Sequence, residues 1–172
     1  MVVRIRWQPP VAAFSYPIGT TPRTAVLVPC FRSGGAIRVF RNGWNEEVER
    51  FAPEAIAASL QQLEQLSRNP IPSLRHSVIV LSHKGDSWLT EAGRERLWSA
   101  FRVPILEQVI GKRGELLATD CEAHGGLHIE SGRLEIDKQD LDTSACSCGR
   151  KSPRLVSTPR TELAYRVAAY AR

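Results

Sequence analysis

Three cysteines and a histidine in the second half of the chain have the residue types and spacing of a metal site. The sequence reads Cys121-Glu-Ala-His124 and, further along, Cys146-Ser-Cys148. Zinc prefers four thiolate or imidazole ligands in a tetrahedral arrangement, and three cysteines with one histidine form a common closed structural shell. We therefore expect Cys121, His124, Cys146 and Cys148 to hold one structural zinc ion.

A second histidine competes for the fourth position in this shell. His128 lies in residues 126–129 (GLHI), where it alternates with apolar neighbours in the manner of a β-strand. This pattern favours an ordinary, partly exposed strand histidine, so His124 is the preferred ligand.

A metal-activated water is the enzymatic alternative for the same residues. It needs three protein ligands and an open position, and Glu122 would then act as acid–base. Zinc deaminases of this kind have a His-x-Glu order and two later cysteines separated by two residues. Here the order is Cys-Glu-x-His, and one residue separates Cys146 from Cys148. Because a fourth good ligand is present, we expect a closed structural site and assign no catalytic residue.

The expected location of the protein supports a metal role for the cysteines. Arg4 and Arg6 are not followed by the apolar stretch that a secretory signal or a transmembrane helix requires. We expect a cytoplasmic protein without a membrane partner, and cysteines in that compartment bind metal more often than they form disulfides. Cys30 stands alone and is expected to be a buried apolar residue.

Two longer stretches around the cysteines are also distinctive: residues 120–130 (DCEAHGGLHIE) and residues 146–155 (CSCGRKSPRL). In this order they resemble the phenylacetate–coenzyme A ligase branch of the acyl-adenylate-forming enzymes, where a CEA…GLHI segment precedes a C-CGR–PRL segment. The resemblance covers residues 77–155, roughly. It implies a fold derived from these ligases, and some members with a histidine in the first segment look like zinc binders.

The catalytic parts of that family do not carry over to this sequence. Residues 18–22 (IGTTP) are too short for its phosphate-binding loop, and residues 109–113 (VIGKR) lack the aromatic residue and the glutamate of its adenylate motif. The ribose-binding aspartate is missing unless Asp140 or Asp142 is a displaced remnant. We therefore expect a non-catalytic zinc-binding accessory or interaction protein derived from this ligase fold. The alternative within the resemblance is a subunit of a split acyl-CoA ligase.

The positive charge of the chain leaves nucleic-acid binding as an alternative of another class. The formal net charge is +5, and arginines cluster modestly around the last cysteines. A zinc-containing nucleic-acid-binding protein would combine phosphate contacts with aromatic stacking. The candidate residues for these contacts are Arg150, Lys151, Arg154, Arg160, Tyr165 and Tyr170.

The elements that must position these residues indicate an α/β fold. Short apolar runs predict strands at 24–29, 36–40, 77–81 and 103–106. Apolar spacing predicts a helix at 53–63 and another at 90–101, which Thr90 caps and which buries Leu97, Trp98 and Phe101. We expect a partly parallel sheet with two or three helices, followed by a β-hairpin and zinc-knuckle portion.

The second half of the chain is expected to differ in character. Residues 127–130 and 133–136 predict two strands joined as a hairpin by Ser131 and Gly132, and residues 161–171 predict a closing helix. We divide the chain into an α/β portion at 1–110 and a β-hairpin and zinc-knuckle portion at 111–172, within one compact domain.

Association is the expected mode of action. In the family resembled, further elements cover this part of the fold, so apolar surface is expected at the outer side of residues 103–106 and on the closing helix. We expect another protein subunit or a second copy of the chain to bury this surface. The alternative is that the first 76 residues cover it within one chain.

Overall fold

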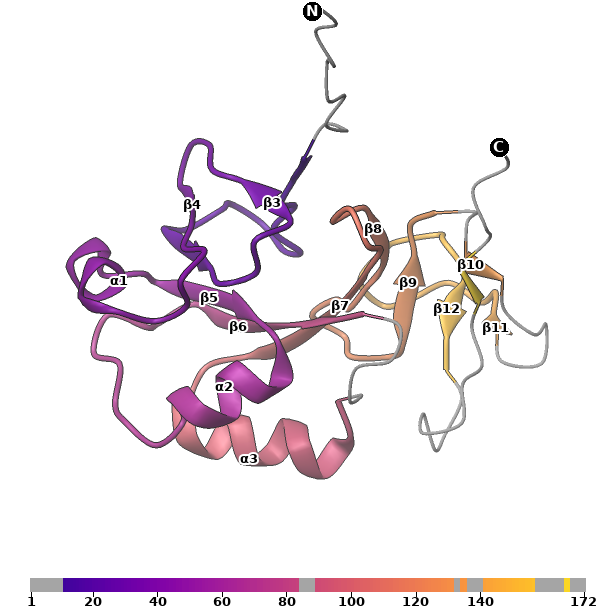
Figure 1. The fold of residues 1–172 in the computed structure, drawn as a ribbon. Helices are drawn as coiled ribbons and strands as arrows, with labels where there is room; N and C mark the ends of the chain where they lie inside the picture. Colours follow the sequence, from indigo (N-terminus) through magenta and orange to yellow (C-terminus); the bar gives the residue numbers. More distant parts are fainter. Residues whose placement is uncertain (1–10, 84–88, 132–133, 136–140, 157–165, 168–172) are drawn as a thin grey trace, which may run out of the picture.

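The computed structural model describes residues 11–83, 89–131, 134–135, 141–156 and 166–167 (Figure 1). Most of the strands in this part of the chain form one nine-stranded sheet. Its strands are, in spatial order, β4 (Ile37–Val39), β2 (Thr24–Val26), β5 (Ala55–Ala58), β6 (Ser77–Ser82), β7 (Ile105–Ile110), β8 (Leu116–Thr119), β9 (Leu127–Ile129), β12 (Arg154–Leu155) and β11 (Leu141–Asp142).

The sheet changes from parallel to antiparallel pairing at β7. The strands from β4 to β7 are all parallel to their neighbours, and every pair from β7 to β11 is antiparallel. The expected division after residue 110 therefore falls at this change of pairing. It also falls between two hydrogen-bonded neighbours, because β7 and β8 pair directly. Two small pairs lie outside the main sheet: β1 (Ala12–Ala13) with β3 (Phe31–Arg32), and β10 (Leu134–Glu135) with β13 (Arg166–Val167).

Three helices accompany the described strands, and each begins at a residue suited to cap it. They are α1 (Glu46–Phe51), α2 (Leu60–Leu66) and α3 (Glu91–Phe101). Asn45 caps α1, Ser59 forms a capping box with Gln62 at α2, and Thr90 accepts the Gly93 amide at α3. The α/β class with a partly parallel sheet and three helices confirms the sequence prediction.

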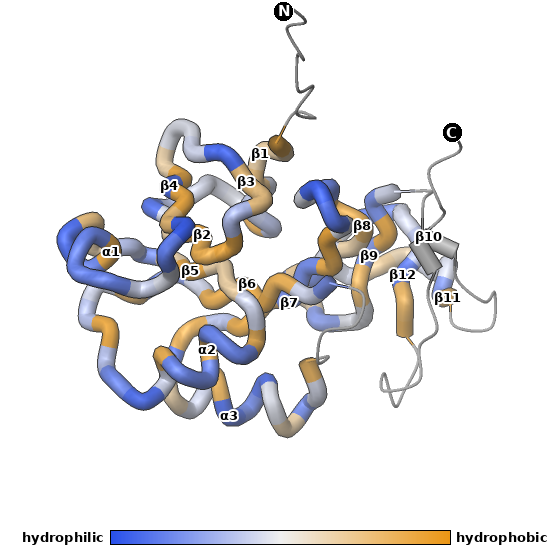
Figure 2. The backbone as a smooth tube through the Cα atoms, in the orientation of Figure 1, coloured by the Kyte–Doolittle hydropathy of each residue, from blue (hydrophilic) through white to orange (hydrophobic). Residues whose placement is uncertain are grey.

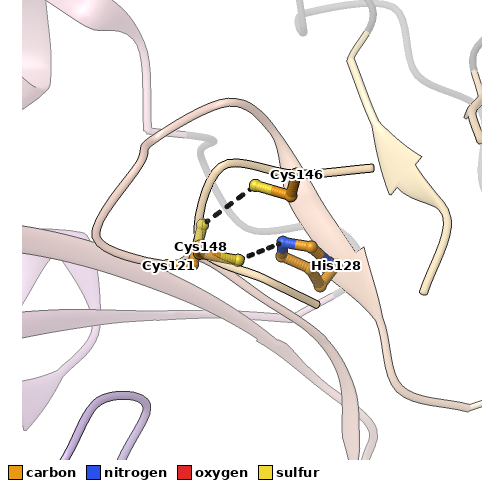
Figure 3. Close-up of side chains that lie close together, drawn as sticks. All are labelled: Cys121, His128, Cys146 and Cys148. Atoms are coloured by element: carbon orange, nitrogen blue, oxygen red, sulfur yellow. Dashed lines mark hydrogen bonds between the residues drawn. The ribbon is translucent and has the colours of Figure 1, made fainter. Parts of the chain in front are cut away.

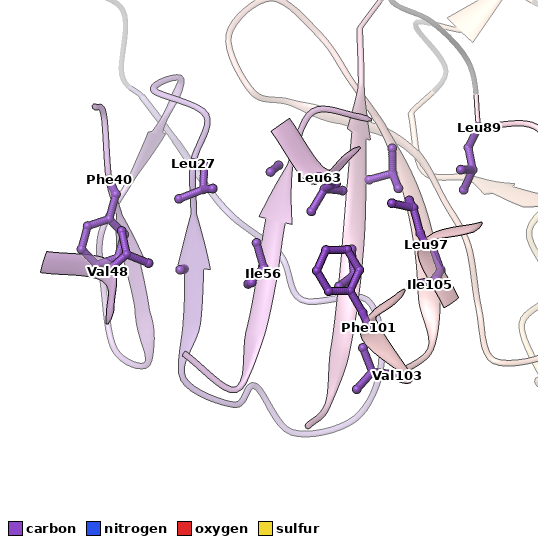
Figure 4. Close-up of a cluster of buried hydrophobic side chains, with 14 residues drawn as sticks. Leu27, Phe40, Val48, Ile56, Leu63, Leu89, Leu97, Phe101, Val103 and Ile105 are labelled. Carbon is purple, nitrogen blue, oxygen red and sulfur yellow. The ribbon is translucent and has the colours of Figure 1, made fainter. Parts of the chain in front are cut away.

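Both faces of the parallel part of the sheet are covered, by α2 and α3 on one side and by the first part of the chain on the other (Figure 1). On the helix side, Leu63, Leu97 and Phe101 pack against strand residues (Figure 4). On the other side, Phe14 and Phe31 meet edge to face over β5 and β6. The central strands are correspondingly apolar, whereas polar residues lie on the outer sides of the helices (Figure 2).

The helix expected at residues 53–63 is wrong in its first half. Residues 55–58 form strand β5, all four with no exposed surface, between β2 and β6. The helix begins only at Leu60, after the Ser59 cap. Ile56, Leu60 and Leu63 have helical spacing by coincidence. A short strand that is buried on both faces lacks the alternation of polar and apolar residues that would have identified it as a strand.

The expected hairpin is also wrong. Strand β9 pairs with β8 and β12, whereas β10 pairs with β13. The expected closing helix includes β13, so its two described residues, Arg166 and Val167, are in a strand. The remainder of that helix lies outside the described residues.

One of the two surfaces expected to take part in association, at residues 103–106, is buried inside the chain. Val103, Ile105 and Leu106 are buried within the chain, so the first part of the chain and α3 supply that cover. Trp98, which was expected to be buried, is half exposed on α3. No helix in the described part of the chain has the length and apolar character needed to cross a bilayer.

Candidate metal centre

Three separate segments bring three cysteines and one histidine together at the antiparallel end of the sheet (Figure 3). Cys121 lies two residues after the end of β8, and His128 lies on β9. Cys146 and Cys148 lie in the connection between β11 and β12. The ligand atoms of these four residues all lie within 4.8 Å of one another.

Two distances between ligand atoms in this cluster are close to those of a tetrahedral zinc shell. The Sγ atoms of Cys121 and Cys146 are 3.8 Å apart, and the Sγ atom of Cys148 is 3.4 Å from Nε2 of His128. With zinc–sulfur bonds of about 2.3 Å and zinc–nitrogen bonds of about 2.0–2.1 Å, tetrahedral angles place sulfurs about 3.8 Å apart and sulfur about 3.6 Å from nitrogen. Cys121, His128 and Cys146 are buried. The chemistry and spacing of the donor set therefore fit a closed structural zinc site.

His128 is oriented by a hydrogen bond on the far side of its ring. Its Nδ1 lies 3.0 Å from the Oγ atom and 3.3 Å from the backbone oxygen of Ser152. A proton on Nδ1 donated to Ser152 leaves the lone pair of Nε2 directed at the cysteine sulfurs. Metal-binding histidines usually have such an outer partner, which selects the tautomer and fixes the ring.

The structure brings together three of the four expected ligands, but the histidine in the cluster is His128 rather than His124. The Nδ1 atom of His124 lies 3.2 Å from Oδ2 of the buried Asp120 and 3.3 Å from Nη1 of Arg94. Arg94 also forms an ion pair with Asp120 at 2.9 Å. His124 has a left-handed backbone conformation with φ of 47°, and its side chain is 40% exposed, on the surface beside α3.

The alternation around His128 did not distinguish a strand histidine from a ligand. Leu127 and His128 are both buried, because β9 lies between β8 and β12 and both faces of the strand are covered at this point. The direction of the His128 side chain depends on the pairing of β9 with β12, which the sequence pattern does not reveal. His124 has the more familiar spacing from Cys121, but the turn after β8 directs it to Asp120.

The protonation of the cysteines is uneven without a cation. The backbone amide of Cys148 hydrogen-bonds the Cys146 sulfur and lowers the pKa of Cys146 to about 6. Burial raises the pKa of Cys121 to about 11. A bound divalent cation favours thiolates and would counteract the desolvation of Cys121. The metal would therefore bind with the release of thiol protons.

The chain around the cluster is held in place by a tight turn at Gly149 and by hydrogen bonds from Arg154. Gly149 turns with φ of 85°, and its amide donates to the Cys146 carbonyl. Nη1 of Arg154 donates to the Gly125 carbonyl at 3.0 Å, and its Nη2 contacts Ser144 and the Asp142 carboxylate. The buried Arg154 thus ties the turn after β8 to strand β11.

Asp142, one candidate for a ribose-binding remnant, is occupied by these contacts. Its carboxylate pairs with Arg154, and Oδ1 accepts the Ser144 amide at 2.8 Å. The bonds from Ser144, with Arg154 nearby, lower the pKa of Asp142. The other candidate, Asp140, lies outside the described residues.

Comparison with known proteins identifies a similar fold but no family. No protein-family model and no curated protein matches the sequence. Among solved structures, the chain is similar to 2-hydroxyisobutyryl-CoA ligase in an open conformation with 2-HIB-AMP and CoA, with a TM-score of 0.58 and 12% sequence identity. The match covers 80% of this chain and 45% of that ligase chain. The likeness shows an acyl-CoA-ligase-like α/β fold, of which this chain spans less than half the ligase length.

Proposed function

We propose that this chain is a zinc-stabilised accessory or interaction protein built on part of an acyl-CoA-ligase-like fold. The observation that carries the proposal is the convergence of Cys121, His128, Cys146 and Cys148 within 4.8 Å at the end of the ligase-like sheet. With four protein ligands the shell is complete, which favours a structural ion over an ion that activates water. Glu122 is then not needed as an acid–base, and we assign it no such role.

The residues that stand in place of the family's ribose-binding and adenine-binding residues support a non-catalytic role. Asp142 is engaged by Arg154 and Ser144, so its carboxylate is not free to bind a ribose. Residues 109–113, which end β7 and begin the following turn, present no aromatic side chain for an adenine ring. To form an adenylate, this chain alone would have to contact the ribose and the adenine ring through other residues.

We further propose that this chain derives from the phenylacetate–CoA ligase branch of the acyl-adenylate-forming enzymes. The two segments that resemble that branch, 120–130 and 146–155, are the two that supply all four residues of the cluster. The second candidate function, a subunit of a split acyl-CoA ligase, is supported by the match to less than half of a ligase chain. In either form the protein would act by association with another subunit or with itself.

Nucleic-acid binding is less well supported by the contacts of the basic residues. Arg154 is buried and bonded to Gly125 and Asp142. Arg150 donates to Glu130 and to the Pro17 carbonyl. Of the described residues in the expected basic cluster, this leaves Lys151 without a protein partner.

Two measurements on the purified protein test this proposal. Native mass spectrometry with elemental analysis should report close to one zinc per chain, together with any co-purifying subunit. Cys146→Ser should then lower the free energy of unfolding by several kcal/mol, since a ligand present at a thousand times its Kd stabilises by about 4 kcal/mol. A metal-free protein that melts normally after chelator treatment would contradict the zinc role.

Catalysis is tested separately by ATP–pyrophosphate exchange with aryl and short-chain carboxylic acids. We expect no exchange above background from this chain alone. Exchange that persists in a highly purified sample and is lost in a point variant of this chain would overturn the non-catalytic role. Exchange that appears only after addition of a co-purifying subunit would favour the split-ligase alternative.

A further inference from the structure

A polar cavity of about 430 Å³ lies beside the metal centre and contains none of its four candidate ligands. Three parts of the chain line it: residues 15–17 before β2, side chains of β7 and β8 with Glu130, and residues 150–152 before β12. These parts are far apart in sequence, and the fold brings them together around one space.

The base of the cavity is formed by buried polar side chains of the sheet. Gln108 on β7 is 1% exposed and Thr119 on β8 is 2% exposed. Leu106 and Ile110, two positions before and after Gln108 on the same face, belong to the apolar core. A glutamine at this position interrupts the apolar pattern, and burial of an amide is unfavourable unless its polar atoms are hydrogen-bonded.

Only one end of the Gln108 amide is satisfied by the described residues. Its Nε2 donates to the Ser15 carbonyl at 2.9 Å and to Oγ1 of Thr119 at 3.3 Å. Its Oε1 receives no hydrogen bond from the part of the chain that the structure describes, and it is not among the fully enclosed unpaired atoms. With its nitrogen fixed by two acceptors, Gln108 therefore offers Oε1 as an oriented acceptor to a molecule in the cavity.

The wall of the cavity carries a net positive charge. Arg150 is fixed by Glu130 Oε1 at 3.0 Å and by the Pro17 carbonyl at 2.8 Å, so these two opposite charges balance. Lys151 lines the same space, is exposed, and forms no ion pair with any residue described in the structure. The hydroxyl of Ser152 is anchored to His128 of the metal cluster, which positions this wall.

We propose that this cavity binds a small anion that also carries a hydroxyl group, either a phosphate ester or a hydroxycarboxylate. The ammonium group of Lys151 pairs with the anionic end, and Oε1 of Gln108 accepts a hydrogen bond from the hydroxyl group. The volume suits a molecule of metabolite size, since small-molecule sites begin at about 300 Å³. The proposal depends on the cavity and its side chains and not on the identity of the metal.

The test uses glycerol 3-phosphate and lactate as probes, with methyl phosphate and propionate as their analogues without an alcohol hydroxyl group. Each is titrated into the protein as purified, at constant ionic strength, by calorimetry or NMR. We expect one of the hydroxylated probes to bind more tightly than its analogue, which also identifies the anion as phosphate or carboxylate. Binding by neither class would overturn the proposal.

Two variants separate this cavity from general surface charge. Lys151→Gln should weaken binding by about tenfold, the value of a charge-assisted hydrogen bond, whereas the exposed control Lys112→Gln should leave it unchanged. Gln108→Leu should abolish the preference for the hydroxylated probe. Equal weakening by both lysine variants would overturn the proposal, and this comparison remains valid even if Gln108→Leu fails to fold.

Discussion

The imidazole of His128 is held between two parts of the structure: Nδ1 lies 3.0 Å from Oγ of Ser152, and Nε2 faces the sulfur of Cys148 at 3.4 Å. The first contact orients the ring, and the second places a nitrogen at ligand distance from the cysteines. Ser152 lies four residues beyond Cys148 on the same connection. The segment that supplies two of the cysteines therefore also orients the histidine opposite them.

The choice between the two histidines can be tested with matched variants. His128→Asn should lose most of its zinc, because the remaining three ligands leave an open shell. His124→Asn should keep close to one zinc per chain, because His124 contacts Asp120 and Arg94 instead. Elemental analysis and competition with a chromogenic chelator measure both. Loss of metal from the His124 variant, with retention in the His128 variant, would restore the ligand set that the sequence favoured.

The hydrogen bond that Nδ1 of His128 donates to Ser152 predicts a smaller effect on zinc affinity. Ser152→Ala removes the Oγ partner of His128 but leaves the backbone oxygen, which is 3.3 Å from Nδ1. Loss of such an outer partner costs about 10–100-fold in metal affinity, and we expect the lower end of this range. Ser99→Ala, on an exposed position of α3, is the matched control. Equal zinc affinities for the two variants would show that the backbone contact alone orients His128.

The sequence was most informative where one residue acts locally. Thr90 caps α3 as expected, because a capping side chain depends only on the next few residues. The parallel pairing of β6 and β7 around α3 also follows from the order of elements. The capping residue and the order of the elements along the chain predicted the α/β class of the fold.

Features that depend on distant pairing could not be predicted in the same way. Among the described strands, β9 pairs with β8 and β12 and not with β10, although Ser131 and Gly132 favour a hairpin between β9 and the strand that follows. The same pairing buries His128 next to Cys148. The three cysteines were recognisable by residue type, whereas the identity of the histidine depended on strand order.

Glu54 should make stability fall at acid pH. A hydrogen bond from Arg75, assisted by the Arg23 amide at 3.2 Å, lowers the pKa of Glu54 in the folded protein. A carboxyl group whose pKa is lower when folded stabilises the protein above its unfolded pKa, and this contribution disappears as the pH falls through the folded pKa. Wild type should therefore be more stable than Glu54→Gln at pH 7, and this difference should become smaller as the pH is lowered from 7 to 3.

Urea unfolding of both proteins at the two pH values measures this difference. Protonation of the cysteine and histidine cluster affects both proteins alike at acid pH, so its effect on the free energy of unfolding cancels in the comparison. A difference that stays constant between pH 7 and pH 3 would mean that Glu54 stabilises through packing rather than charge.

Leu97 and Trp98 are adjacent on α3, and the sequence pattern predicted that both are buried. The structure predicts very different effects on stability when each is replaced by alanine. Leu97 is 2% exposed in the core beside Phe101, whereas Trp98 is 50% exposed, with the Arg102 guanidinium 5.1 Å from its ring centroid. Leu97→Ala should reduce the free energy of unfolding by about 2–5 kcal/mol, since it removes buried methyl groups and leaves a cavity. Trp98→Ala should cost about 1 kcal/mol or less, the value of an exposed cation–π contact. Chemical denaturation of the two variants measures both values, and a larger loss for Trp98 than for Leu97 would mean that an interface in solution covers the tryptophan.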